Sequence, residues 1–192
     1  MERELVEGAR AGDRAAFEAL VRLKVDAVYG TALAILGHEA DAQDAVQEAF
    51  VAAWRSIAGL RDVDRFDAWF GRIVVNACRM SLRKRRGVHE IAVPSARADP
   101  SRTDGDAGSD GDLREQPSHD RPLADLAAAA DTFDRAFDHL SANERALLVL
   151  RHRDELPVAE IAARLGIPGG TVKSRLFTAR RALERALARE DR

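Results

Sequence analysis

The chain has 192 residues, of which 46% are hydrophobic and 32% are charged, an ordinary composition for a chain that folds around a core. Its 30 lysine and arginine residues nearly balance 32 aspartate and glutamate residues, so the total charge excludes neither an acidic nor a basic partner. The single cysteine, Cys78, excludes a disulfide within one chain. Its place in an apolar helical run predicts a small buried side chain.

The N-terminal residues 1–14 are charged throughout, which argues against a signal peptide. No uninterrupted apolar stretch reaches the length that a membrane-spanning helix needs. We therefore expect a cytoplasmic protein without membrane insertion.

Three amphipathic helices are predicted in residues 12–86, since apolar residues recur there at helical spacing. The first ends at Gly37, the second covers about 39–57 and is followed by Gly59, and the third starts near Asp64. The apolar face predicted for the third helix comprises Phe66, Trp69, Phe70, Ile73, Ala77 and Met80. These faces can pack together into one small helical core.

Residues 87–122 differ in composition from the rest of the chain. From Pro94 to Pro122 the sequence holds Ser, Gly, Asp and Pro with almost no large apolar side chain. Such a segment cannot bury enough surface to offset its ordering entropy, so we predict a flexible acidic linker. The predicted domains are therefore 1–86 and 123–192, two small all-helical units.

Helical signal returns near Leu123 and runs past His139. Ser141 and Glu144 have the spacing of a capping box, which predicts the start of a further helix. A compact helix is then expected over 157–165, with Gly166 just past its end.

The last helix is predicted to begin at Thr171, after a turn over 167–170. Together with the helix over 157–165 it has the proportions of a helix-turn-helix, whose second helix enters the major groove of DNA. Short hydrogen-bonding side chains and cations at its start suit base readout with phosphate anchoring. This recognition segment consists of Thr171, Lys173, Ser174, Arg175, Thr178 and Arg181. The alternative is a helical hairpin with a solvated basic face.

Two further helix faces carry candidate binding residues. A basic face on the third helix repeats at steps of four and three, and it comprises Arg72, Asn76, Arg79, Arg83 and Arg86. Such a face can hold a phosphate backbone and read a base. An acidic stripe on the second helix comprises Asp41, Asp44, Gln47, Glu48 and Val51. The alternative for the stripe is an ordinary solvated helix face.

The motifs also resemble those of a known family, the extracytoplasmic-function sigma factors. The segment 160–176 resembles their region 4, and 41–50 resembles their region 2.2. The run 66–70, with the basic residues that follow it, resembles regions 2.3 and 2.4. The chain departs from the pattern at three positions, which are Pro157, Thr178 and Ser81.

This resemblance implies a two-domain all-helical fold and a role in transcription initiation. In the family, the surface corresponding to the acidic stripe docks on the β′ clamp helices of RNA polymerase, and the polymerase β flap is a further partner. The basic face is implied to capture the melted −10 promoter strand, and the recognition segment to read the −35 element. An anti-sigma factor is an implied partner. Two alternatives are a sigma-like decoy that binds only a regulator and a conventional helix-turn-helix activator.

Catalysis has little support in the sequence. The spacing of the histidines does not match that of paired metal ligands. They are His38, His89, His119, His139 and His152. No phosphate loop or nucleophile motif occurs. We expect no enzyme activity, no metal site and no cofactor.

Overall fold

The computed structural model describes residues 1–90 and 123–190, with side chains described for 1–85 and 128–190. Every regular element in these ranges is a helix, which confirms the all-helical prediction. The longer helices are α1 (Glu2–Arg10), α2 (Arg14–Leu36), α3 (Glu39–Ser56), α4 (Phe66–Glu90), α5 (Leu123–Asp138), α6 (Ala142–Leu148), α7 (Val158–Leu165) and α8 (Gly169–Glu190). Short helical segments are η1 (Ile57–Gly59), η2 (Val63–Arg65) and the π-helical η3 (Val149–Arg153).

Helix α1 was not among the predicted elements, although it packs on α2 through the buried side chains of Val6 and Ala9. It also contacts the segment that leads into α4. The Arg3 Nη1 atom lies 2.7 Å from Asp64 Oδ1, and Arg10 Nη1 donates to the Leu60 carbonyl oxygen at 3.5 Å. Helix α1 therefore holds this connecting segment against the helical core.

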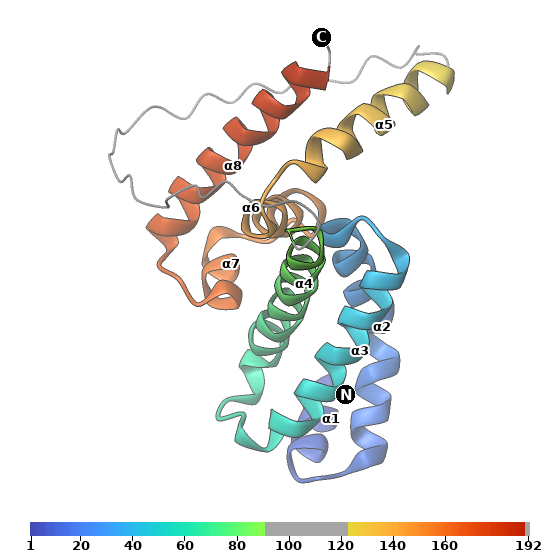
Figure 1. The fold of residues 1–192 in the computed structure, drawn as a ribbon. Coiled ribbons are helices and arrows are strands. Elements are labelled where there is room, and N and C mark those ends of the chain that lie inside the picture. Colours follow the sequence, from blue (N-terminus) through green and yellow to red (C-terminus); the bar gives the residue numbers. More distant parts are fainter. Residues whose placement is uncertain (91–122, 191–192) are drawn as a thin grey trace.

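Helices α2, α3 and α4 pack against one another and form the body of the N-terminal half (Figure 1). Asp13 begins α2 because its Oδ1 atom accepts hydrogen bonds from the Ala15 and Ala16 amides at 2.8 and 3.2 Å. Gly37 ends α2 at φ 74°, in the left-handed region that glycine adopts without steric cost, as the sequence predicted.

Helix α4 differs from its prediction in three respects. It begins at Phe66 after the short η2 turn, and it continues to Glu90, four residues past position 86. Met80, which was predicted on the apolar face, is 63% exposed, and that prediction is wrong. The buried seam instead follows a regular helical spacing through Phe66, Phe70, Val74, Ala77, Cys78 and Leu82. Met80 lies off this seam and faces solvent.

The two tryptophans pack differently from each other. Trp69 is partly buried, with its ring centroid 5.8 Å from that of Phe66. Trp54 lies 5.0 Å from Phe17 by the same measure but remains 39% exposed on α3. Trp69 therefore packs against the core, in agreement with its place on the predicted apolar face, whereas Trp54 lies at the edge of the core.

In the C-terminal half, the predicted capping box starts α6. The Glu144 amide donates to Ser141 Oγ at 3.3 Å, and the Ser141 amide donates to Glu144 Oε2 at 2.8 Å. Gly166 ends α7 at φ 67°, as predicted. Helix α8 begins at Gly169, two residues earlier than predicted, because the Pro168 carbonyl already accepts the Val172 amide at 3.1 Å.

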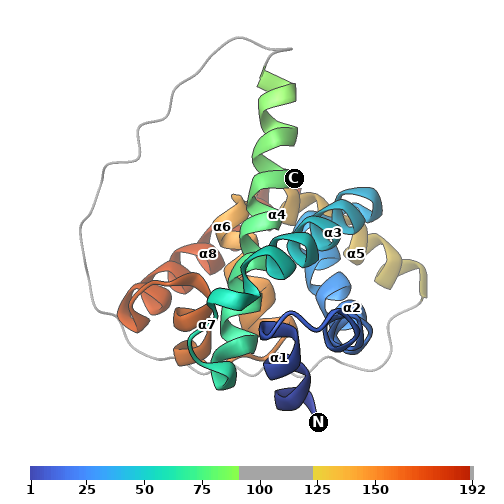
Figure 2. The same ribbon diagram turned by 90° about the horizontal axis from the view of Figure 1, so that it is seen from below.

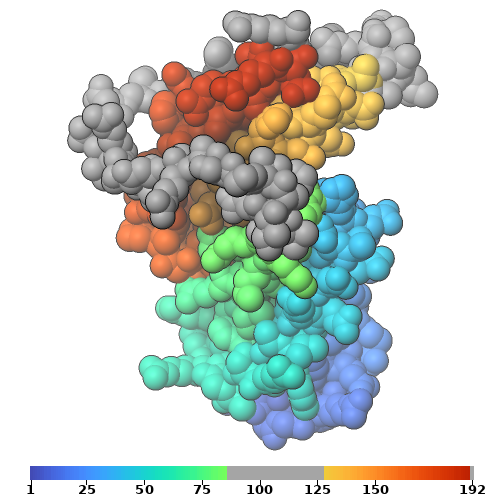
Figure 3. Space-filling model, in the orientation of Figure 1, coloured from blue at the N-terminus to red at the C-terminus, as the bar shows by residue number. Residues whose placement is uncertain are grey.

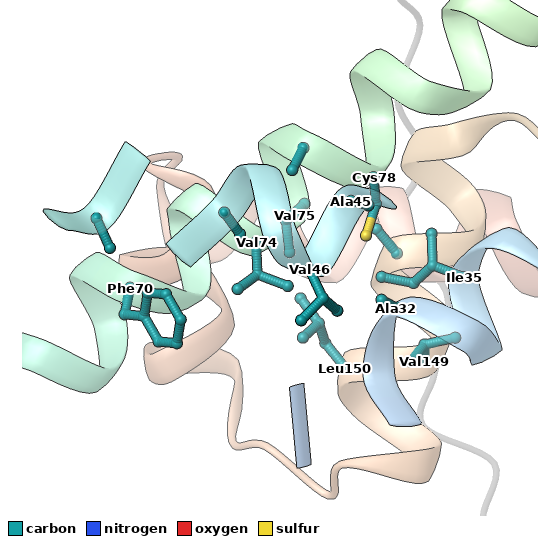
Figure 4. Packing of buried hydrophobic residues seen from close by; sticks show 14 of the residues in the cluster. Ala32, Ile35, Ala45, Val46, Phe70, Val74, Val75, Cys78, Val149 and Leu150 are labelled. Atoms are coloured by element: carbon teal, nitrogen blue, oxygen red, sulfur yellow. The ribbon is translucent and has the colours of Figure 1, made fainter. Parts of the chain in front are cut away.

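Buried side chains from both halves form one large cluster, and a second, smaller cluster in the C-terminal half comprises Leu140, Leu148 and Ala179. Figures 1 and 2 place α7 beside α4, and Figure 3 shows the C-terminal half seated directly on the N-terminal half. Fully buried Leu150 shares the large cluster with Val74 and Val75 of α4 (Figure 4). Ile161 of α7, also fully buried, belongs to the same cluster. The linker was predicted over 87–122, but residues 87–90 belong to α4. The remainder, 91–122, lies outside the described residues, so the division into domains stays a prediction.

The Cys78 side chain is fully buried in this cluster, in agreement with its predicted role. Burial raises the pKa of its thiol to about 12, because a thiolate would lose its hydration. We therefore expect no reaction with a thiol-specific chromogenic reagent at pH 8 in the native protein. One thiol should react after unfolding in denaturant, and rapid native labelling would contradict this placement.

Candidate functional site

The acidic stripe lies on the outer side of α3. Asp44, Gln47, Glu48 and Val51 are exposed, and all four line one open groove of about 450 Å³. The structure thus brings together the residues that the sequence singled out. Asp41, the fifth member, is partly buried.

A second groove, of about 360 Å³, lies between α3 and α4. Asp41 Oδ2 is 3.4 Å from Arg85 Nη1 there, which links the stripe to α4. The sequence analysis did not place any α4 residue beside the stripe. Four α4 residues line this groove, and they are Met80, Ser81, Lys84 and Arg85. Met80 and Lys84 are four residues apart, as are Ser81 and Arg85, and this spacing could have revealed a second face of the helix. The sequence analysis instead interpreted this helix from the arginines of its basic face.

The basic face divides into exposed and covered members. Asn76 and Arg83 are exposed, whereas Arg79 is partly buried. Arg72 also has solvent access, but its Nη2 atom donates to the Ala163 carbonyl oxygen of α7 at 2.8 Å. The fifth member, Arg86, lies outside the described side chains.

Arg79 has an unusual environment for an arginine. Its Nε atom is buried and has no hydrogen-bond partner within the described part of the chain. Burial lowers the pKa of the guanidinium, and the positive charges of Arg83 and Arg175 lower it further. Arg175 belongs to α8, so cations of both halves meet at this point. A phosphate is the kind of group that would offset this charge.

The recognition segment lies on the first turns of α8, as the helix-turn-helix prediction requires. Lys173, Ser174, Arg175, Thr178 and Arg181 are exposed, and Thr171 is partly buried. The Ser174 hydroxyl donates to the Thr171 carbonyl at 3.1 Å, and the Thr178 hydroxyl donates to the Ser174 carbonyl at the same distance. Both hydroxyls must therefore rotate away from the backbone before they can donate to a base.

Phe177 was missed by the sequence analysis. Its side chain is 59% exposed, and the Arg181 guanidinium carbon lies 5.7 Å from the ring centroid. It follows Lys173 by four positions and Ser174 by three, so the three residues share one helix face. That spacing was the signal that could have found it.

Within the described ranges, no cluster of three or more His, Cys, Asp or Glu side chains could bind a metal ion. In the same part of the chain, no helix combines the length and apolar character that crossing a bilayer demands.

Two family matches cover the two halves. Residues 20–88 match Sigma-70 region 2, and residues 130–183 match Sigma-70, region 4. The first match contains the acidic stripe and the basic face, and the second contains the recognition segment.

Similar proteins align over nearly the whole chain. The RNA polymerase sigma-H factor of Pseudomonas aeruginosa is 30% identical over 97% of this chain and 93% of that protein. The ECF RNA polymerase sigma-E factor of Escherichia coli K12 is 32% identical over 94% of this chain and 91% of that protein. The solved structure of CnrH in complex with the cytosolic domain of CnrY is 28% identical, covers 97% of both chains and has a TM-score of 0.63. From its sequence, its helix faces and these likenesses, the chain belongs to the extracytoplasmic-function group of the sigma-70 family of RNA polymerase sigma factors.

Proposed function

We propose that this sigma factor binds core RNA polymerase through the acidic stripe and reads promoter DNA through two separate helix faces. The observation that carries the proposal is the joint exposure of these surfaces on helices of one chain. The stripe lines an open groove on α3, and the recognition segment lies free on the first turns of α8. A protein with only one of these surfaces would bind either polymerase or DNA, whereas promoter-specific initiation needs both.

The −35 element is assigned to α8 on physical grounds. A helix of this kind fits the major groove, where each base pair presents a distinct set of donors and acceptors. Lys173 and Ser174 supply donors there, and the exposed Phe177 ring can contact a thymine methyl group. The later Arg181 is placed to hold a phosphate.

The −10 element is assigned to the basic face of α4. Binding of a melted strand needs cations along the backbone and a group that reads an unstacked base. Arg83 supplies such a charge, and the exposed Asn76 amide supplies both a donor and an acceptor.

A third polymerase contact is proposed at an apolar groove of about 610 Å³ between α5 and α8. Phe133 and Phe137 of α5 and Leu183 and Leu187 of α8 line it. Aromatic and aliphatic walls of this kind suit an apolar segment of a partner, and we assign the polymerase β flap to it.

Control by an anti-sigma factor is the remaining part of the proposal. The similar protein CnrH was solved with the cytosolic domain of CnrY bound. A partner of this class would act by covering the acidic stripe or the groove between α5 and α8, since both must be free for polymerase to bind.

The test is transcription in vitro with purified chain, core polymerase and a library of randomised promoters. We expect transcripts only when the chain and core are both present, from templates that share two spaced elements. Transcription that requires a second sigma factor would point to a conventional activator. Binding of neither core nor DNA would point to a decoy, and either outcome would overturn the proposal.

A further inference from the structure

Helix α1 lies outside both family matches, since the first of them starts at residue 20. Neither the polymerase contacts nor the DNA contacts proposed for the chain involve this helix. It packs on α2 through Val6 and Ala9, and it contacts the short segments η1 and η2 that lead into α4 (Figure 2). Because the −10 strand is assigned to α4, an element that fixes the start of α4 affects how that strand is read.

The basic face of α4 continues beyond the helix onto the connecting segment, residues 60–65. Arg65 immediately precedes α4, and it is about two helical turns before Arg72. Arg61 and Arg65 are both exposed. A single strand that follows the arginines of α4 toward the start of the helix therefore reaches the connecting segment next.

Helix α1 contacts the first residue of the connecting segment. The Leu60 side chain is buried, which anchors this residue in the core. The Arg10 Nη1 atom lies 3.5 Å from the Leu60 carbonyl oxygen, so α1 also contacts the backbone there. Asp62 then turns the chain, because its Oδ1 atom accepts the Asp64 amide at 3.0 Å. The path from Leu60 to Asp64 is thus fixed at its start and in its middle.

Ion pairs hold the end of the connecting segment and the first turn of α4. The Arg3 Nη1 atom lies 2.7 Å from Asp64 Oδ1. Lys24 of α2 lies between two carboxylates, with its Nζ atom 2.7 Å from Glu2 Oε1 and 2.9 Å from Asp67 Oδ1. The Lys24 side chain is only 19% exposed, so water screens its pairs less than it screens an ordinary surface pair. Charge therefore joins α1, α2 and α4 at the point where the basic face begins.

We infer that α1 positions the connecting segment for reading the −10 strand, and that Arg3 and Lys24 are the positioning residues. The inference rests on the function proposed for the basic face. A segment that is already ordered loses less conformational entropy when a strand binds. Its side chains and backbone also discriminate between bases only when they are held in one place. Without Arg3 and Lys24, the end of the segment next to α4 loses the ion pairs that hold it.

The experiment reverses one charge on α1 in the full chain and measures base preference at the −10 element. Arg3→Glu replaces the ion pair with Asp64 by a repulsion. Holoenzymes made with the parent or the variant chain select templates that they open from a library randomised at the −10 element. We expect preference to relax by about 3- to 5-fold in the variant, the size expected when a surface ion pair is lost and reversed. Core affinity and −35 preference should stay at the parent values.

Arg14→Glu is the matched control for this variant. Arg3 and Arg14 are both exposed, and each has a glutamate four residues later at 3.1 Å. Arg3 differs from Arg14 by its additional contact with Asp64. The two variants change the net charge equally and lose the same kind of pair within a helix. A difference between them therefore reports on the contact with the connecting segment.

Further variants separate the ion pairs from damage to the fold. Adding Asp64→Arg to Arg3→Glu restores an ion pair with its charges exchanged, so −10 preference should return toward the parent value. Asp64→Arg alone measures the effect of the added cation, which should strengthen binding to all sequences alike. Lys24→Met leaves the carboxylates of Glu2 and Asp67 without the cation between them, and we expect it to relax −10 preference by about 10-fold.

Identical −10 preferences in the Arg3→Glu and Arg14→Glu chains would overturn the inference. A parallel fall in core affinity and −10 preference would also overturn it, because α1 would then only support the fold. A double variant that stays as relaxed as Arg3→Glu would show that the contact with Asp64 is not the cause. If the parent chain itself has no preference at the −10 element, the function proposed for the basic face fails, and the inference fails with it. A parent with a clear preference and unchanged variants would remove the inference alone.

Discussion

Charge reversal at Asp44 and Glu48 is expected to lower the affinity of the chain for core polymerase by about 100-fold, since like charges facing each other across an interface cost several kcal/mol. Both side chains are exposed and line the same groove on α3, so their reversal leaves the helical core untouched. Affinity is measured by titrating labelled Asp44→Lys/Glu48→Lys chain with core polymerase.

The matched control reverses two exposed acids on α2, Glu18→Lys and Asp26→Lys. Glu18 has only a surface ion pair with Arg14, 3.1 Å long, whose loss costs little. The control should bind core like the parent chain, and circular dichroism should be the same for all three. Equal core affinity in parent and stripe variant would remove the acidic stripe from the interface.

The second large effect is expected at the start of α8. Lys173→Ala should relax preference at one position of the −35 element by about 10- to 100-fold, because a base-edge contact contributes roughly 1–3 kcal/mol of discrimination. Thr178→Arg should create a new preference, since a longer cationic side chain can reach a guanine that threonine cannot. Selection from a randomised −35 library reads both results.

Arg189→Ala is the control for this selection. Arg189 is exposed in the last turn of the same helix, far along the axis from the recognition segment. Its loss can weaken binding to all sequences but should leave base preferences unchanged. If the parent, Lys173→Ala and Thr178→Arg chains select the same sequences, α8 does not read the −35 element through these residues.

Several helix limits in the C-terminal half were predictable because they depend on local chemistry. The capping box of Ser141 and Glu144 starts α6, and Gly166 ends α7 because glycine adopts the left-handed conformation more easily than any other residue. The start of α8 was predicted two residues too late because the pair Gly169 and Gly170 has a low helix propensity. The hydrogen bond that the Pro168 carbonyl accepts at the start of the helix cannot be recognised from the sequence.

Helix α1 was missed for a different reason. Its surface is charged almost throughout, and only the narrow stripe formed by Val6 and Ala9 is buried. Met80 was misplaced because the spacing of apolar residues fixes the orientation of the buried face of α4 only to within part of a helical turn. Which residues are buried is decided by the contacts that α4 makes with helices of both halves.

The packing of the two halves could not be read from the sequence at all. Apolar spacing in η3 and α7 is consistent with burial of Leu150 and Ile161, but it does not say which helices bury them. Their actual neighbours include Val74 and Val75, far away in the sequence. The same holds for Gly30 and Gly71, where an added Cβ atom would collide with Arg153 and Arg164, arginines more than 90 positions away in the sequence.

The shared core has a thermal consequence. Separating the two halves would bring apolar side chains such as Leu150 and Ile161 into water, so opening carries a positive change in heat capacity. Because burial of apolar surface weakens as water cools, the contact between the two halves should become weaker at low temperature.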